Sequence, residues 1–126
     1  MLRAPRHLAP LVLAIALCLA AGCTDGTASC SSPSVTVEAT VTDHGMDPSA
    51  VAVCRGQEVT LEVHSQTDAV LHLHGFDDQV PAASLTPGET TTFEITADVA
   101  GQFIIELHDR SGASSTEIGV LTVNEP

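Results

Sequence analysis

The sequence contains no lysine, no tryptophan and no tyrosine, and only three phenylalanines. With so few aromatic rings, the core of the fold must consist mainly of Val, Leu and Ile. Basic residues are also scarce: residues 23–126 hold all 16 acidic residues but only Arg55 and Arg110 as bases, which gives a formal charge of −14. Such a surface repels nucleic acid and anionic lipid headgroups and attracts cations. We therefore expect no nucleic-acid partner, although the charge by itself indicates no more than solubility.

A long apolar run is also lacking. The main run, Leu11–Ala21, is too short to span a bilayer stably. It follows Arg3 and Arg6, and a short apolar run behind basic residues at an N-terminus is typical of a secretory signal peptide. We predict that residues 1–22 direct export and are then removed.

The signal ends in Leu-Ala-Ala-Gly-Cys at residues 19–23, which resembles the bacterial lipobox, although the consensus has a larger apolar residue in place of Ala20. In lipobox proteins the Cys is acylated before the chain is cleaved in front of it. Ordinary cleavage after small residues is the alternative. A two-chain anchor holds a protein stably to a bilayer. We therefore predict an exported protein, anchored by lipid on Cys23 to the outer face of a bacterial membrane.

Two of the four cysteines remain once Cys18 leaves with the signal and Cys23 carries the lipid. In an exported protein, a remaining pair such as Cys30 and Cys54 most often forms a disulfide. Its loop of 24 residues would add about 3 kcal/mol of stability in the chain-entropy model. A thiolate metal site is the alternative, which we disfavour because neither cysteine lies near a histidine in the sequence.

One domain accounts for most of the mature chain. Residues 23–34 are mostly Ser, Thr, Gly, Asp and Pro and are predicted to form a flexible tether. Residues 35–126 are the length of one domain, and they show short runs of alternating apolar and polar residues rather than helical patterns. Turn residues separate the runs, so we predict an all-β sandwich of seven to eight strands. The expected strands are 35–41, 51–53, 59–64, 69–76, 79–85 (strand or loop), 90–96, 103–108 and 117–123.

The most informative motif is His72-Leu73-His74, which lies within the apolar run 69–76. Side chains alternate between the two faces of a β-strand, so both imidazoles should share one face while Leu71 and Leu73 point into the core. Two imidazoles side by side supply half of the ligands of a metal site.

A second strand repeats this arrangement. In residues 103–108, the alternation puts Phe103, Ile105 and Leu107 on one face and Glu106 and His108 on the other. Side chains on two paired strands form a compact patch, with opposed Cβ atoms about 5 Å apart. If the two strands are neighbours, three imidazoles and one carboxylate converge.

Several features between residues 35 and 123 follow one another in a set order. They are an opening strand, the turn Met46-Asp47-Pro48, Gly56 before a strand, His72 after a polar turn, the turn Pro87-Gly88, a strand ending at His108 and the closing strand 120–123. This order resembles the cupredoxin-like family of small exported domains. The resemblance implies a Greek-key β-sandwich.

The family resemblance also implies a position for the metal. In blue-copper members, one His comes from the middle of the domain, and a Cys, a second His and usually a Met precede the last strand. His72 or His74 matches the first role and His108 the second. However, no Cys and no Met follow Phe103, and the copper–thiolate bond defines a blue site. We therefore exclude a blue-copper electron carrier.

Imidazoles with a carboxylate suit Cu(II), with Zn(II) as the competing metal that the affinity order disfavours. We predict that His72, His74 and His108 are nitrogen ligands. Glu106 is either a fourth ligand or an acceptor that orients one imidazole.

Other polar residues have simpler explanations. His44-Gly45-Met46 is a possible soft-ligand site, but Met46 is better explained as a core residue. His64 is expected on the solvent face of its strand. Asp77 and Asp78 are either further carboxylates near the site or, as we favour, residues that shape a turn.

The leading hypothesis is a membrane-anchored copper-binding protein that captures, delivers or buffers metal outside the cytoplasm and passes it to an unidentified protein partner. The alternative is a metal-free accessory module that keeps the fold and has lost the site. We do not expect an enzyme, because the sequence shows no second acid–base pair, no Ser-His-Asp spacing and no Gly-rich phosphate loop.

Overall fold

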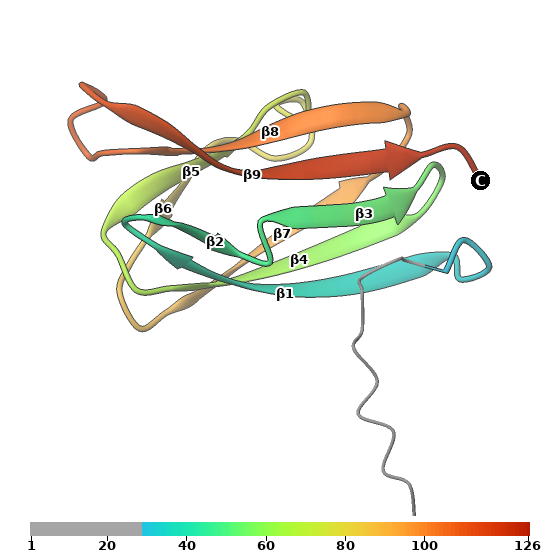
Figure 1. Cartoon of the computed structure of the whole chain (residues 1–126), viewed down its shortest axis with the longest axis horizontal. Helices are drawn as coiled ribbons and strands as arrows, with labels where there is room; N and C mark the ends of the chain where they lie inside the picture. The colour runs from blue at the N-terminus through green and yellow to red at the C-terminus, as the bar shows by residue number, and fades with distance from the viewer. Residues whose placement is uncertain (1–28) are drawn as a thin grey trace, which may run out of the picture.

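The computed structural model describes residues 29–126, which form an all-β structure. The predicted signal peptide, Cys23 and residues 23–28 of the predicted tether lie outside the described residues. The described part has nine strands (Figure 1): β1 (Ser34–Thr42), β2 (Gly45–Asp47), β3 (Ala50–Cys54), β4 (Glu58–Ser65), β5 (Ala69–Leu73), β6 (Ala83–Leu85), β7 (Thr90–Thr96), β8 (Gly101–His108) and β9 (Ser115–Asn124).

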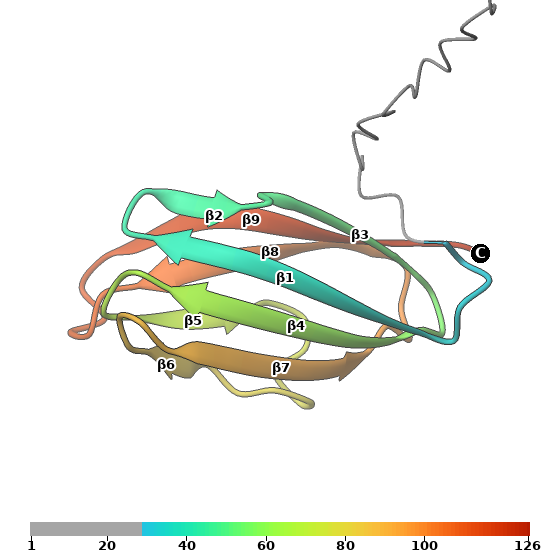
Figure 2. The same ribbon diagram turned by 90° about the horizontal axis from the view of Figure 1, so that it is seen from below.

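The strands form two sheets that face each other, which confirms the predicted β-sandwich. One sheet has the order β2-β1-β4-β7 and the other β3-β9-β8-β5-β6. Figure 2 shows the first sheet in front, with β8 and β9 behind it. β1 and β4 run parallel, as do β3 and β9, while the other pairs are antiparallel.

The hydrophobic core lies between the sheets and follows from the period-two alternation of the strands. In β4, for example, Val59, Leu61 and Val63 are buried while the residues between them are partly or fully exposed. Aliphatic residues make up most of the core, as the absence of Trp and Tyr requires. The most completely buried large side chains are Leu71, Leu73, Leu85, Ile105, Val41, Val53 and Val63.

The expected seven to eight strands are at least one too few, because β2 was not recognised. Its three residues lie next to a turn in the sequence and carry no alternating pattern of their own. They form a strand because they pair with the end of β1, where Val41 faces Met46. Met46 itself is 7% exposed and belongs to the core, as predicted.

A clamp at one end of the sandwich holds the start of the described chain. The predicted disulfide between Cys30 and Cys54 is confirmed, with Cα atoms 5.4 Å apart. The buried Gln57 side chain accepts a hydrogen bond from the Cys54 N–H at 2.8 Å and donates to the carbonyls of Ser29 and Ser32. Residues 29–33 are therefore attached to the domain just before β1 begins.

Removing the disulfide with Cys30→Ala and Cys54→Ala is expected to lower the free energy of unfolding by about 3 kcal/mol, because the unfolded chain regains the entropy of a 24-residue loop. Urea unfolding of the parent and the double variant measures this loss. A reductant should destabilise the parent and leave the variant unchanged. Equal stability of the two proteins without reductant would contradict the prediction.

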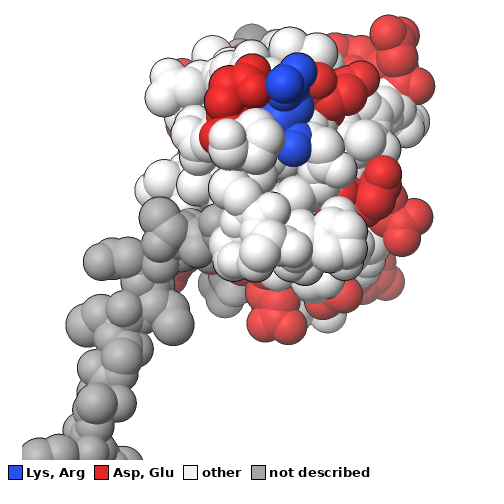
Figure 3. Space-filling view, turned by 90° about the vertical axis from the view of Figure 1, so that its right-hand side faces the viewer, with Lys and Arg blue, Asp and Glu red and all other residues white. Residues whose placement is uncertain are grey.

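The two basic side chains of the described part are both engaged by carboxylates. The Arg55 Nε lies 3.0 Å from the Glu125 Oε2, and the Arg110 Nε donates a hydrogen bond to the Asp68 Oδ1 at 2.5 Å. Figure 3 shows one end of the molecule, where basic atoms gather in one spot and acidic side chains lie around it. The remaining carboxylates leave a strongly negative surface that attracts cations. Among residues 29–126, no helix is long and apolar enough to cross a membrane.

Candidate metal centre

The site begins with the pairing of β5 and β8, which are antiparallel neighbours. In their register His72 lies directly opposite Glu106, and Val70 lies opposite His108. Leu71 and Leu73 are 0% and 2% exposed and turn into the core, so the histidine between them faces outward, as the alternation predicted. The pairing therefore brings the two polar motifs onto one face of the sheet.

His74 reaches the same face from just beyond the strand. β5 ends at Leu73, so His74 stands in the following turn rather than in the predicted strand. Its N–H still donates to the Ile104 carbonyl at 3.0 Å, which continues the ladder with β8 by one residue. Gly75 then takes a positive φ of 83° and turns the chain away.

The polar side chains of the two motifs converge. One ligand atom from each of His72, His74, Glu106 and His108 lies within 4.8 Å of the others. The Glu106 Oε2 lies 2.5 Å from the His74 Nε2 and 3.3 Å from the His108 Nε2, while the His72 and His74 ring centroids are 4.0 Å apart. The four side chains are 21% to 44% exposed, so an ion could enter from solvent.

Glu106 keeps its negative charge to a lower pH than an ordinary glutamate. Hydrogen bonds from the Ser115 hydroxyl and with the His74 imidazole, in that order of size, lower the pKa of Glu106. A register shift between β8 and β9 pairs Ile105 with Gly119 but Glu106 with Glu117. A second carboxylate, that of Glu117, thus lies across from Glu106 on the same face.

The structure places Asp77 at the site, whereas the sequence analysis favoured a turn-shaping role for it over that of a further carboxylate near the site. Its Oδ1 lies 2.5 Å from the His72 Nε2, and this hydrogen bond is the main cause that lowers the pKa of Asp77. Asp77 does lie in the turn after β5, but its side chain reaches back to the strand. No signal in the sequence distinguished it from Asp78.

The chain after His108 is fixed by Asp109. This carboxylate accepts hydrogen bonds from the Ser111 and Ala113 N–H groups at 2.9 and 3.2 Å and from the Ser111 and Ser114 hydroxyls at 2.5 Å each. The two hydroxyls are the largest causes that hold the pKa of Asp109 far below its ordinary value. These hydrogen bonds close a loop that begins at the residue following His108.

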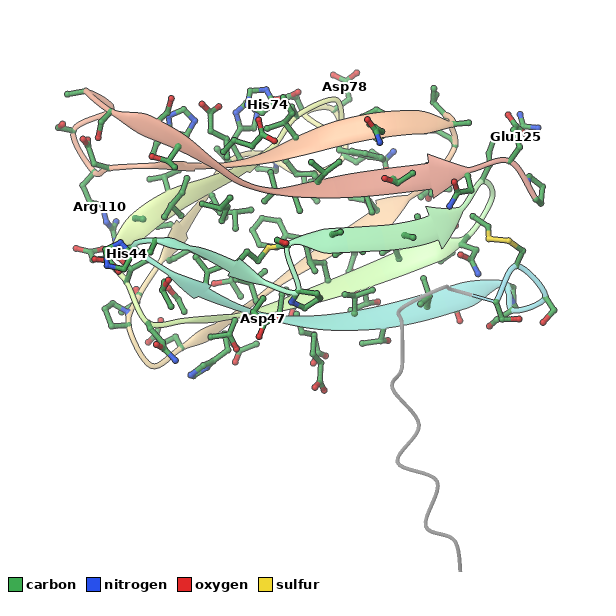
Figure 4. The ribbon with its side chains drawn as sticks, viewed as in Figure 1. His44, Asp47, His74, Asp78, Arg110 and Glu125 are labelled. Atoms are coloured by element: carbon green, nitrogen blue, oxygen red, sulfur yellow. A yellow bond between two sulfur atoms is a disulfide. The ribbon has the colours of Figure 1, made fainter. Side chains whose placement is uncertain are left out.

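Three residues weighed in the sequence lie away from this cluster. His44 is 89% exposed, and Figure 4 places it near one end of the molecule, well apart from His74. Met46 is buried in the core, so the two do not form a soft-ligand pair. His64 is exposed on β4 of the other sheet, as predicted.

The sequence matches the cupredoxin-like domain family over residues 10–123. The chain belongs to this family. No curated protein matches it significantly. Among solved structures, the cupredoxin-like chain is similar to a copper binding protein in the apo form, solved by NMR, with a TM-score of 0.59 and 16% identity over 74% of this chain and 90% of the other.

Two further structures share the fold. The metal binding domain of the Streptococcus pneumoniae D39 Cu(I) exporting P-type ATPase CopA, solved with Cu(I), has a TM-score of 0.54 and 14% identity over 72% of this chain and 86% of the other. A multi-copper oxidase from Pseudomonas thermotolerans has a TM-score of 0.57 and 18% identity over 73% of this chain and 30% of the other. At these identities the likeness concerns the fold.

The donor set determines which metal chemistry the cupredoxin-like chain can support. Cys30 and Cys54, the only cysteines among residues 29–126, are joined to each other. The described residues therefore offer no thiolate for a blue-copper site. Three imidazoles and a carboxylate fit a nitrogen-rich site for Cu(II) or Zn(II).

Proposed function

We propose that this cupredoxin-like domain binds Cu(II) through His72, His74, His108 and Glu106, and that it captures, delivers or buffers the metal. The observation that carries this proposal is the register of β5 and β8, which sets His72 opposite Glu106 and gathers the four ligand atoms within 4.8 Å. Two rigid strands supply three of the ligands, so most of the site exists before the ion arrives.

The spacing of the donors supports a single ion. Ligands with metal–nitrogen bonds near 2 Å lie about 3 to 4 Å from one another, so side chains within 4.8 Å need only small rotations. The contacts of Glu106 with His74 and His108 support these three side chains as neighbouring ligands of one ion. Copper is preferred over zinc by the affinity order of divalent metals. The copper-binding relatives of the same fold agree with this choice.

The cellular setting is also part of the proposal. A lipid on Cys23 would hold the exported domain at the outer face of a bacterial membrane, and a negative surface would concentrate cations near the site. We propose binding and transfer to a protein partner rather than catalysis as the role of the chain.

Replacing Glu106 with Gln tests the site while nearly preserving shape. The parent is expected to bind about one equivalent of Cu(II) in a calorimetric titration with a competing chelator. Glu106→Gln is expected to weaken binding by at least about 10- to 100-fold, the cost of losing a group that only supports a ligand, because the ion loses an anionic ligand that also contacts His74 and His108.

Glu117→Gln is the matched control, because it removes the same charge from the position opposite Glu106 on β9. Its affinity should fall clearly less than that of Glu106→Gln, because Glu117 contributes only a nearby charge whereas Glu106 contacts two of the imidazoles. If the two variants lost the same Cu(II) affinity, the loss would come from the removed charge alone, and Glu106 would not be a ligand. A parent that binds no Cu(II) would favour the metal-free accessory module.

A further inference from the structure

His72 differs from the other two histidines in the carboxylate that it meets. The Nε2 atoms of His74 and His108 both approach Glu106 on β8, at 2.5 and 3.3 Å. The His72 Nε2 instead lies 2.5 Å from the Oδ1 of Asp77. The three histidines thus have two carboxylate partners, Glu106 for His74 and His108 and Asp77 for His72.

The loop that carries Asp77 is anchored from inside. Phe76 is 2% exposed and packs edge-on against Phe103 of β8, with ring centroids 4.7 Å apart. The Phe76 carbonyl accepts hydrogen bonds from the N–H groups of Gln79 and Val80, at 2.9 and 2.8 Å, which closes the turn around Asp77. The residue before Asp77 is therefore held in the core.

The same loop is fastened to the other sheet. The Gln79 side chain donates to the Thr96 carbonyl at 3.1 Å and accepts from the Thr96 N–H at 2.7 Å, so it binds the end of β7 in both directions. Asp77 thus lies between two attachment points. Asp78, its neighbour, is exposed, and Figure 4 shows it at the outer rim of the molecule near His74.

We propose that Asp77 is a positioning residue that holds the neutral His72 ring with its proton on Nε2, so that Nδ1 is the nitrogen presented to a metal. A neutral imidazole has one donor and one acceptor nitrogen, and an ionised carboxylate can only accept. The Nε2–H must therefore face Asp77. A carboxylate behind a ligating imidazole also fixes the ring and strengthens the ligand. The metal part of this inference rests on the proposed function.

The tautomer can be read without any metal. In long-range ¹H–¹⁵N spectra of the full protein, recorded where the imidazoles are neutral, the parent should show His72 protonated on Nε2, with a proton signal protected from exchange. Asp77→Ala should lose this protection. Asp78→Ala is the matched control, because it removes the same charge and the same atoms one residue away, and it should keep the protected signal.

Metal titration gives the second readout. Asp77→Ala is expected to weaken Zn(II) and Cu(II) binding about tenfold, and Asp78→Ala should match the parent. In the Zn(II)-loaded parent, the ¹⁵N shifts should assign His72 Nδ1 as the ligand. Protonation of His72 on Nδ1 in the metal-free parent, ligation through Nε2, or equal affinities of the two variants would each overturn the inference. A protected Nε2 proton in a parent that binds no metal would overturn the proposed function alone.

Discussion

Replacing both His72 and His108 with alanine is expected to weaken Cu(II) binding by more than about 100-fold. Loss of a group that merely orients a ligand costs about 10- to 100-fold in metal affinity, and removal of two ligands must cost more. Each substitution takes one imidazole from a different strand, which leaves only His74 and Glu106 of the four donors. With only two protein donors, the remaining coordination positions of the ion are left to water, and binding is weaker.

The fold should survive this double substitution, because both side chains stand on the outer face of the sheet. The core residues beside them, Leu71 and Leu107, are untouched. His64→Ala is the control, since His64 is exposed on the other sheet and its loss should leave affinity unchanged. Cu(II) titrations of the parent, the double variant and His64→Ala measure the affinities, and thermal unfolding verifies that each protein is folded. Parent-like affinity in the double variant would disprove the proposed ligands.

The sequence predicted the faces of the two site strands because alternation is a local property. Leu71 and Leu73 carry enough apolar surface to fix which side of β5 is buried, and Ile105 and Leu107 do the same for β8. His72, Glu106 and His108 then follow on the opposite side. The resemblance to the cupredoxin-like family, which rested on turns and glycines in order, is confirmed by the family match over residues 10–123.

The pairing of β5 with β8 could not be predicted from local sequence patterns. β5 and β8 are separated in the sequence by β6 and β7, and β7 belongs to the other sheet. Their pairing therefore depends on how the whole sandwich closes. The same holds for Glu117, which faces Glu106 only because the register of β8 and β9 shifts at Ile105.

The contact of Asp77 with His72 could not be predicted for a related reason. A turn residue's side chain is directed by the loop's attachments, here the burial of Phe76 and the bonds of Gln79 to Thr96. No repeating pattern of apolar and polar residues in the sequence indicates these contacts. His74 likewise reaches the site from a turn, so its position depends on the glycine that follows it.

Gly75→Ala is expected to destabilise the domain by roughly 2 to 5 kcal/mol and to weaken copper binding through His74. Gly75 has a φ of 83°, a conformation that costs L-residues about 1 to 2 kcal/mol. An added Cβ would also lie 2.5 and 2.9 Å from the Cδ1 and Cε1 atoms of Phe103. Overpacking of this kind costs about 1 to 3 kcal/mol more.

Gly88→Ala separates the two causes, because Gly88 has nearly the same φ, 84°, and a Cβ there would meet nothing within 4 Å. It should lose only the backbone part, about 1 to 2 kcal/mol, and should bind copper like the parent. The difference between the variants in urea unfolding then measures the contact with Phe103. Because relief of that contact must move the ring or the turn that carries His74, Gly75→Ala alone should lower copper affinity. Equal stability and equal affinity of the two variants would show that Phe103 yields freely and that Gly75 does not position His74.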